Sequence, residues 1–197
     1  MKNESSNVDD LSGYRVCSSE TEKTVEDQCV VGLNRPSWDE FWFTVALMYS
    51  TRATCNRLRT ATVIVKNNKL VGAGYNGSPS GADHCDDVGH LMINGHCERT
   101  LHGEQNAIIN TSREDLKGST AYILGTPCLR CFKELVASGV LEVKCLGTYS
   151  NSLGKDKLVR LSKEYNVVIK FFDYNPAELL KKSILMLKRK GGILHSS

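Results

Sequence analysis

The sequence predicts an α/β protein, a three-layer α/β/α sandwich built on a five-stranded mixed sheet. Short runs rich in β-branched residues recur along the 197-residue chain, and segments with helical spacing alternate with them in its second half. The first two runs are joined by Asn67-Asn68, which favours an antiparallel hairpin. The strand–helix–strand units that follow favour parallel pairing. Together these patterns predict a mixed sheet with helices on both faces.

Individual elements follow from caps and apolar spacing. Ser37 is followed at the third position by Glu40, the pattern of a capping box, and the apolar residues after it indicate a buried helix from Trp38 to about Ala53. Gly139 is expected to end a later helix. We expect strands within 61–68, 69–77, 119–126, 141–149 and 167–174, and further helices within 102–112, 128–138, 156–166 and 176–190.

The two ends of the chain differ from its middle. Residues 1–34 lack hydrophobic periodicity and are rich in Ser, Glu and Asp, which predicts a disordered acidic leader before a folded domain at 35–175. The leader resembles neither a secretory signal nor a transit peptide, so we expect a cytoplasmic protein whose cysteines are metal ligands or buried residues. Residues 176–197 predict a basic amphipathic helix and tail. No stretch is apolar enough for a membrane span, and the net charge of +3 does not imply nucleic acid.

The segment GADHCDDVGHLMINGHCERTLHGEQNAI, residues 81–108, is dense in soft metal ligands. It holds four of the five histidines of the chain and two of its eight cysteines. A tetrahedral zinc takes four ligands, and further cysteines lie upstream and downstream. The segment therefore predicts more than one metal.

His102-Gly103-Glu104 and Pro127-Cys128-Leu129-Arg130-Cys131 each stand at a predicted helix start. Cys128 and Cys131 are one turn apart in a first helical turn, where the helix dipole favours thiolates, so both sulfurs can bind one metal. His102 would be the third ligand, which leaves the open position of a catalytic zinc, and Glu104 would move protons. Alone, a Cys-x-x-Cys is as often a redox pair or half of a structural site. The combined H-x-E and P-C-x-x-C pattern resembles the zinc-dependent deaminases.

Beyond this pattern, the chain is similar to the deoxycytidylate (dCMP) deaminase family, particularly its bacterial branch with the late-competence proteins. The resemblance covers residues 35–174 and rests on SWDEFW, STRATCNRL, GYNGSPSG, HCDDVGH, HCERTLHGEQNAI and TPCLRC. It implies a cytidine deaminase-like fold over the predicted domain at 35–175. The chain departs from the family at Gly103, where Ala is usual, and at Thr60-Ala61, where a Val-Gly pair is usual. Neither departure removes a reactive group.

The resemblance also implies a reaction: hydrolysis of dCMP to dUMP and ammonia for thymidylate synthesis. Asn76 is similar to a residue near the sugar and base, Tyr149 to a residue over the nucleotide, and Arg113 to a basic residue at the 5′-phosphate. Strand-end packing for Tyr149 and a solvated surface charge for Arg113 are the alternatives. Members of the family that the chain resembles are typically homohexamers, often activated by dCTP and inhibited by dTTP, with an allosteric site associated with the turn that corresponds to Gly77–Gly81. A homo-oligomer with these effectors is therefore expected.

The same resemblance implies a second, structural zinc. Cys55 and Cys85 match ligand positions of some family members, His90 stands where bacterial relatives have Cys, and Cys97 completes a closed set of three cysteines and one histidine. His84 or His96 could replace His90 or Cys97 in this set. The other alternative is that Cys55 and Cys97 are buried apolar residues.

Two other functions compete with dCMP deamination. The chain could be another zinc deaminase, acting on cytidine, a riboflavin precursor or a nucleic-acid base. A nucleic-acid substrate needs a basic groove with stacking aromatics, and such residues do not cluster around the motifs. It could also be a zinc-stabilised competence or binding protein without catalysis. The intact Glu104 disfavours that function, because a purely structural site needs no general base.

Overall fold

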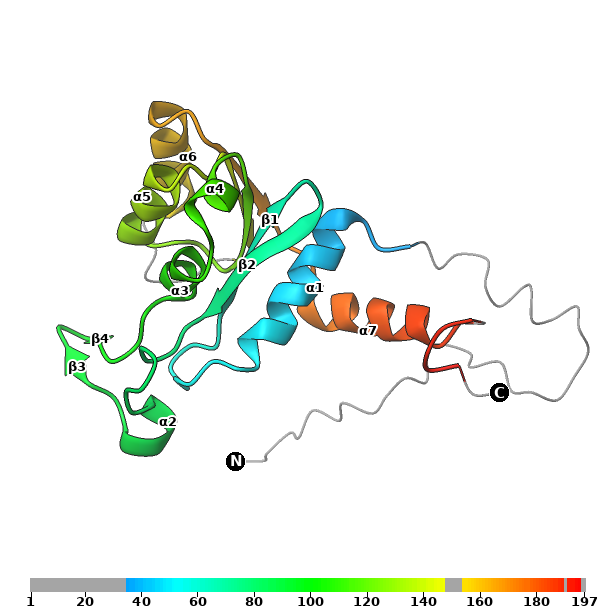
Figure 1. The fold of residues 1–197 in the computed structure, drawn as a ribbon, viewed down its shortest axis with the longest axis horizontal. Coiled ribbons are helices and arrows are strands. Elements are labelled where there is room, and N and C mark those ends of the chain that lie inside the picture. The colour runs from blue at the N-terminus through cyan, green and yellow to red at the C-terminus, as the bar shows by residue number, and fades with distance from the viewer. Residues whose placement is uncertain (1–34, 148–153, 190, 196–197) are drawn as a thin grey trace, which may run out of the picture. The chain divides into compact units, whose positions relative to one another are not determined.

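A single mixed sheet forms the centre of the molecule (Figure 1). The computed structural model describes residues 35–147, 154–189 and 191–195, of which residues 36–184 form one compact unit. Five strands lie in the order β2-β1-β5-β6-β7. Their bounds are Ala61–Lys66 for β1, Lys69–Tyr75 for β2, Thr120–Leu124 for β5, Glu142–Leu146 for β6 and Val168–Phe172 for β7. The predicted five-stranded sheet is confirmed.

The predicted hairpin and the predicted parallel pairing are both present. β1 pairs antiparallel with β2 and with β5, while β5, β6 and β7 are parallel. Asn67 and Asn68 have φ angles of 51° and 55°, the left-handed conformation that a two-residue hairpin turn requires and that Asn tolerates. The hairpin therefore brings the end of β2, and Asn76 beyond it, back to the start of β1.

Seven helices are found among the described residues, and the longer ones cover the sheet. Their bounds are Trp38–Ser50 for α1, Cys85–Val88 for α2, Gly103–Ile109 for α3, Arg113–Leu116 for α4, Leu129–Ala137 for α5, Lys155–Glu164 for α6 and Pro176–Leu187 for α7. The sequence predicts α1, α3, α5, α6 and α7 but not the single turns α2 and α4. None of the helices among the described residues has the length and hydropathy of a membrane span.

Helices lie on both faces of the sheet (Figure 1), and each face carries an apolar core. Strand alternation divides β1 between them, with Val63 in one core and Ile64 in the other. The first core contains residues of α1 and α7, and the second contains residues of α3, α5 and α6. The α3 and α5 side of the sheet carries both halves of the predicted deaminase pattern.

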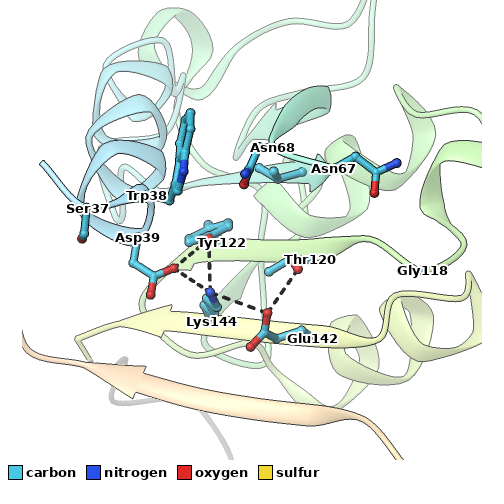
Figure 2. Close-up of a pocket in the computed structure, with 11 residues that line it drawn as sticks. Ser37, Trp38, Asp39, Asn67, Asn68, Gly118, Thr120, Tyr122, Glu142 and Lys144 are labelled. Atoms are coloured by element: carbon cyan, nitrogen blue, oxygen red, sulfur yellow. Dashed lines mark hydrogen bonds and ion pairs between the residues drawn. The ribbon is translucent and has the colours of Figure 1, made fainter.

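Polar contacts as well as apolar packing fix α1 on its face. The predicted capping box is present: the Ser37 N–H donates to Glu40 Oε2 at 2.7 Å, and the Glu40 N–H donates to Ser37 Oγ at 3.2 Å. Next to this cap, Lys144 on β6 donates to Asp39 Oδ1 at 2.6 Å (Figure 2). The Tyr122 hydroxyl donates to the same oxygen at 2.7 Å. These contacts close a polar pocket on the face of the sheet opposite to α3 and α5.

Candidate active site and metal clusters

The two halves of the predicted deaminase pattern meet at two helix starts. His102 is the N-cap of α3, Cys128 is the N-cap of α5, and Cys131 follows in the first turn of α5. His102 Nδ1 lies 3.8 Å from Cys128 Sγ and 3.3 Å from Cys131 Sγ. Zn–S and Zn–N bonds of about 2.3 and 2.0 Å at a tetrahedral angle would separate S and N by about 3.5 Å. The three side chains therefore fit one zinc ion and leave a fourth position open.

The local environment favours a thiolate at the start of α5. The Cys131 N–H donates to Cys128 Sγ at 3.4 Å. Cys128 also lies at the positive end of the helix dipole, which favours a negative charge on its sulfur. A hydrogen bond from the Cys131 thiol, together with one from His102, lowers the pKa of Cys128 to about 3. The hydrogen bond to Cys128 and burial raise the pKa of Cys131. A bound cation would favour the thiolate form of both.

Glu104 lies two residues after His102, in the first turn of α3. Its side chain is 6% exposed, and it lines the same pocket as His102 and Cys128. Burial raises the pKa of its carboxyl to about 7. A carboxyl of this pKa can both accept and release a proton near neutral pH.

Asn76 also lines this pocket, and two hydrogen bonds fix its side chain. Asn76 is 6% exposed, its Oδ1 accepts from the Thr60 N–H at 2.9 Å, and its Nδ2 donates to the Leu58 carbonyl. Both partners precede β1, so the amide joins the end of β2 to the start of β1. Thr60 and Leu58 line the pocket as well.

The second predicted ligand set also comes together. The ligand atoms of Cys55, Cys85, His90 and Cys97 all lie within 4.8 Å of one another. Cys85 Sγ is 3.5 Å from Cys97 Sγ, and Cys55 Sγ is 3.6 Å from His90 Nδ1. These separations are close to the roughly 3.8 Å between sulfurs, and 3.5 Å between sulfur and nitrogen, on a tetrahedral zinc. Four ligands would close the coordination shell, as in a structural site.

In the second cluster, the ring nitrogen of His90 that faces away from the sulfurs has a hydrogen-bond partner, as is usual for a metal-binding histidine. With Nδ1 facing the sulfurs, His90 Nε2 lies 3.0 Å from Asn56 Oδ1, which orients the ring. His84 and His96, the alternative ligands, lie outside the cluster. His96 lines the pocket of Glu104 instead.

The segment between the clusters has almost no core of its own. It contains α2 and a small hairpin of β3, Met92–Ile93, and β4, His96–Cys97 (Figure 1). Cys85 is the only buried residue between positions 82 and 99. Apolar packing therefore contributes little to holding this segment, which leaves its polar contacts and the Cys/His cluster.

Of the two predicted substrate residues that the structure describes, Asn76 lines this pocket and Arg113 does not. Arg113 begins α4 and lines a different hollow with Gln105, Leu116 and Glu134. Tyr149 lies outside the described residues. Sequence reasoning missed Arg57 and His96, which line the pocket. The nearness of Arg57 to Cys55 in the chain was the signal that could have revealed it.

The two departures from the family pattern face each other in the structure. A Cβ atom on Gly103 would lie 3.2 Å from Ala61 Cα, and Ala61 is fully buried. The family resemblance gives Gly and Ala as the usual residues at positions 61 and 103, where this chain has Ala and Gly. The atoms that the added Cβ would meet are the Cα and carbonyl carbon of residue 61, which are present whichever side chain stands there. The hydroxyl of the neighbouring Thr60 donates to the Leu124 carbonyl at 2.6 Å, which satisfies the new polar group.

We therefore expect Gly103→Ala to lower the free energy of unfolding by about 1–3 kcal/mol, because the added methyl group overpacks a tight contact with backbone atoms. Ala61→Gly in the same chain should not restore that loss, because the Cα and carbonyl carbon of residue 61 remain in place. Urea unfolding of both single variants and the double variant measures the coupling energy between the two positions. A double variant more stable than Gly103→Ala would contradict this expectation.

Known proteins resemble the chain in sequence and in fold. Residues 36–146 match the family described as the cytidine and deoxycytidylate deaminase zinc-binding region. ComE operon protein 2 of Bacillus subtilis is 36% identical over 113 residues, which cover 56% of this chain and 60% of that protein. The deoxycytidylate deaminase of Mycobacterium phage D29 is 33% identical over 122 residues, covering 56% of this chain and 95% of the phage protein.

Solved structures support the fold assignment. The dCMP deaminase of cyanophage S-TIM5, solved in complex with dCMP and dUMP, aligns with a TM-score of 0.57 at 23% identity. The alignment covers 71% of this chain and 99% of the phage chain. The predicted cytidine deaminase-like fold is thus confirmed.

Proposed function

The chain belongs to the cytidine and deoxycytidylate deaminase zinc-binding family, and we propose that it hydrolyses dCMP to dUMP and ammonia. The observation that carries this proposal is Glu104, a buried carboxyl in the same pocket as the His102, Cys128 and Cys131 cluster. A structural metal site needs neither an open ligand position nor an adjacent proton carrier. Hydrolytic deamination requires both.

His102, Cys128 and Cys131 would hold the catalytic zinc. When bound, zinc supplies a Lewis acid that lowers the pKa of water from about 16 to about 7 and so makes a nucleophilic oxygen available. Glu104 takes a proton from the attacking water and delivers it to the ring nitrogen of cytosine. It then passes the second proton to the amino group, which departs as ammonia. Only the bond between the cytosine ring and its amino group is broken, and the other bonds of the nucleotide are unchanged.

The finer assignments belong to the same proposal. Asn76 contacts the sugar or base, and Tyr149 and Arg113 remain candidate substrate residues. Cys55, Cys85, His90 and Cys97 hold a second, structural zinc, which makes two ions per chain. A cytoplasmic homohexamer with dCTP and dTTP as effectors follows from the family resemblance alone.

A substrate panel tests the proposal. We expect the purified protein to release ammonia from dCMP about ten- to a hundredfold faster, in kcat/KM, than from deoxycytidine, because charge-assisted phosphate contacts are worth about 1.5–3 kcal/mol. CMP should also be slower than dCMP. The panel is measured by coupled ammonia assay, with and without dCTP. Equal rates on nucleoside and nucleotide would exclude a dCMP-specific enzyme, and no ammonia release from any cytosine compound would exclude a deaminase.

A further inference from the structure

Two asparagines of α3 donate hydrogen bonds to the edge of the sheet. Among the described strands β2 pairs with β1 alone, so the outer carbonyls of β2 have no partner strand. Asn106 Nδ2 donates to the Tyr75 carbonyl at 2.8 Å, and Asn110 Nδ2 donates to the Ala73 carbonyl at 3.2 Å. Four helical residues rise by about 6 Å and two strand residues by about 6.8 Å, so the donors and acceptors have matching spacing. These two bonds attach α3 to β2.

Glycines in β2 allow α3 to approach the strand closely. A Cβ atom on Gly74 would overlap the Ala107 nitrogen and the Gly103 carbonyl oxygen. A Cβ atom on Gly72 would likewise overlap the Thr111 hydroxyl. The backbone of α3 therefore lies directly against β2, where the short asparagine side chains reach its carbonyls.

Asn76 lies between two points at which the end of β2 is bonded to the start of α3. Before it, the Tyr75 carbonyl accepts from Asn106. After it, Gly77 exchanges two backbone hydrogen bonds with Leu101, at 3.2 and 3.0 Å, and Leu101 directly precedes the N-cap of α3. Of these contacts, only that of Asn106 is made by a side chain. It is therefore the contact that a substitution can remove.

We propose that Asn106 is a positioning residue, which fixes the separation between Asn76 at the end of β2 and Glu104 at the start of α3. The Asn106 backbone N–H donates to the His102 carbonyl at 3.0 Å, so the residue that holds Tyr75 lies one turn from the metal-binding histidine. This inference rests on the proposed deamination, in which Asn76 contacts the sugar or base and Glu104 moves protons. Groups that act on one substrate must keep their separation, because a misplacement of about 1 Å can cost about a hundredfold in rate.

Alanine variants of the two asparagines test this role. Asn106→Ala should lower kcat/KM for dCMP by about tenfold, because the end of β2 loses a contact that places Asn76. Asn110→Ala is the matched control: it loses the same kind of bond one turn further along α3, and its kcat/KM should stay within about twofold. Both variants should keep the zinc content of the unmodified protein, since neither asparagine belongs to a cluster. The thermal midpoint of each should fall by about 2–4 °C, as expected for the loss of one hydrogen bond in a chain of this size.

Hydrogen exchange reports the state of the β2 end independently of turnover. The backbone N–H groups of Asn76 and Gly77 both donate to backbone carbonyls. Mass spectrometry should show that these two amides exchange about tenfold faster in Asn106→Ala, because the end of β2 opens locally more often. Their exchange should be unchanged in Asn110→Ala.

Four results would overturn the positioning role. Equal losses of kcat/KM in the two variants would mean that the asparagines only attach α3 to β2. Full activity in Asn106→Ala, or reduced activity with unchanged exchange at Asn76, would also overturn the role. Loss of zinc in Asn106→Ala would mean that it acts through the metal site instead.

Failure of this inference differs from failure of the proposed function. In all four cases dCMP deamination by the unmodified protein still stands. If the unmodified protein releases no ammonia from dCMP, the proposed function fails. The exchange measurement then still decides whether Asn106 holds the end of β2.

Discussion

Glu104→Gln should reduce kcat for dCMP by about a thousandfold, since general acid–base catalysis contributes about 10²–10⁴ in rate. Glutamine has nearly the same shape and volume, so the side chain should stay in the position that Glu104 occupies, where it is 6% exposed. Its amide cannot accept the proton of the attacking water or return one to the ring nitrogen. The reduction corresponds to about 4 kcal/mol of transition-state stabilisation.

Three measurements separate this effect from damage to the site. Zinc content by mass spectrometry and the thermal unfolding midpoint should both match the unmodified protein, because Glu104 is not a ligand of either cluster. KM for dCMP should change little. Glu164→Gln, an exposed carboxylate at the end of α6, is the matched control and should keep full activity. If Glu104→Gln retained more than a tenth of kcat, Glu104 would not be the proton carrier.

The catalytic cluster could be predicted from sequence because its geometry is local. His102 and Glu104 lie in one helix start and Cys128 and Cys131 in another, so helical spacing alone places each pair. That the two helix starts meet at one metal was inferred from the resemblance of the combined pattern to the zinc-dependent deaminases. The Asn67-Asn68 turn and the Ser37 cap could be predicted for the same reason, because each is specified by residues that are neighbours in the sequence.

The structure of the segment at 82–99 could not be predicted from local sequence patterns. β3 and β4 are two residues each, and the apolar Leu91, Met92 and Ile93 are exposed, so periodicity carries no signal there. The shape of the segment depends on ligands that arrive from Cys55, about thirty residues upstream of Cys85, and family resemblance rather than spacing suggested them. The contact of Arg57 with Gly95 depends on that shape. It could not be anticipated from the sequence.

This dependence leads to a second large effect: Cys85→Ala should remove one zinc per chain and unfold the segment locally. The unmodified protein should contain close to two zinc ions per chain, and the variant close to one, with the ion at His102, Cys128 and Cys131 retained. Because Cys85 is the only buried residue between positions 82 and 99, no apolar core remains to hold the segment once the cluster is lost. The sheet and its two cores do not depend on it.

Limited trypsin digestion reports this change at one peptide bond. Arg99 is the only trypsin site between positions 82 and 99, and we expect cleavage after it to be at least about tenfold faster in Cys85→Ala, as local opening predicts. Cys145→Ala is the matched control: Cys145 is fully buried in the core outside both clusters, so that variant should lose stability but keep two zinc ions.

Position 90 provides the sharpest test of the ligand set. His90→Ala should behave as Cys85→Ala does, whereas His90→Cys should keep the second zinc, because thiolate and imidazole both bind zinc tetrahedrally. His84→Ala should have no effect on metal content, since His84 lies outside the cluster. One zinc per chain in the unmodified protein, or loss of zinc on replacing His84 but not His90, would contradict this assignment.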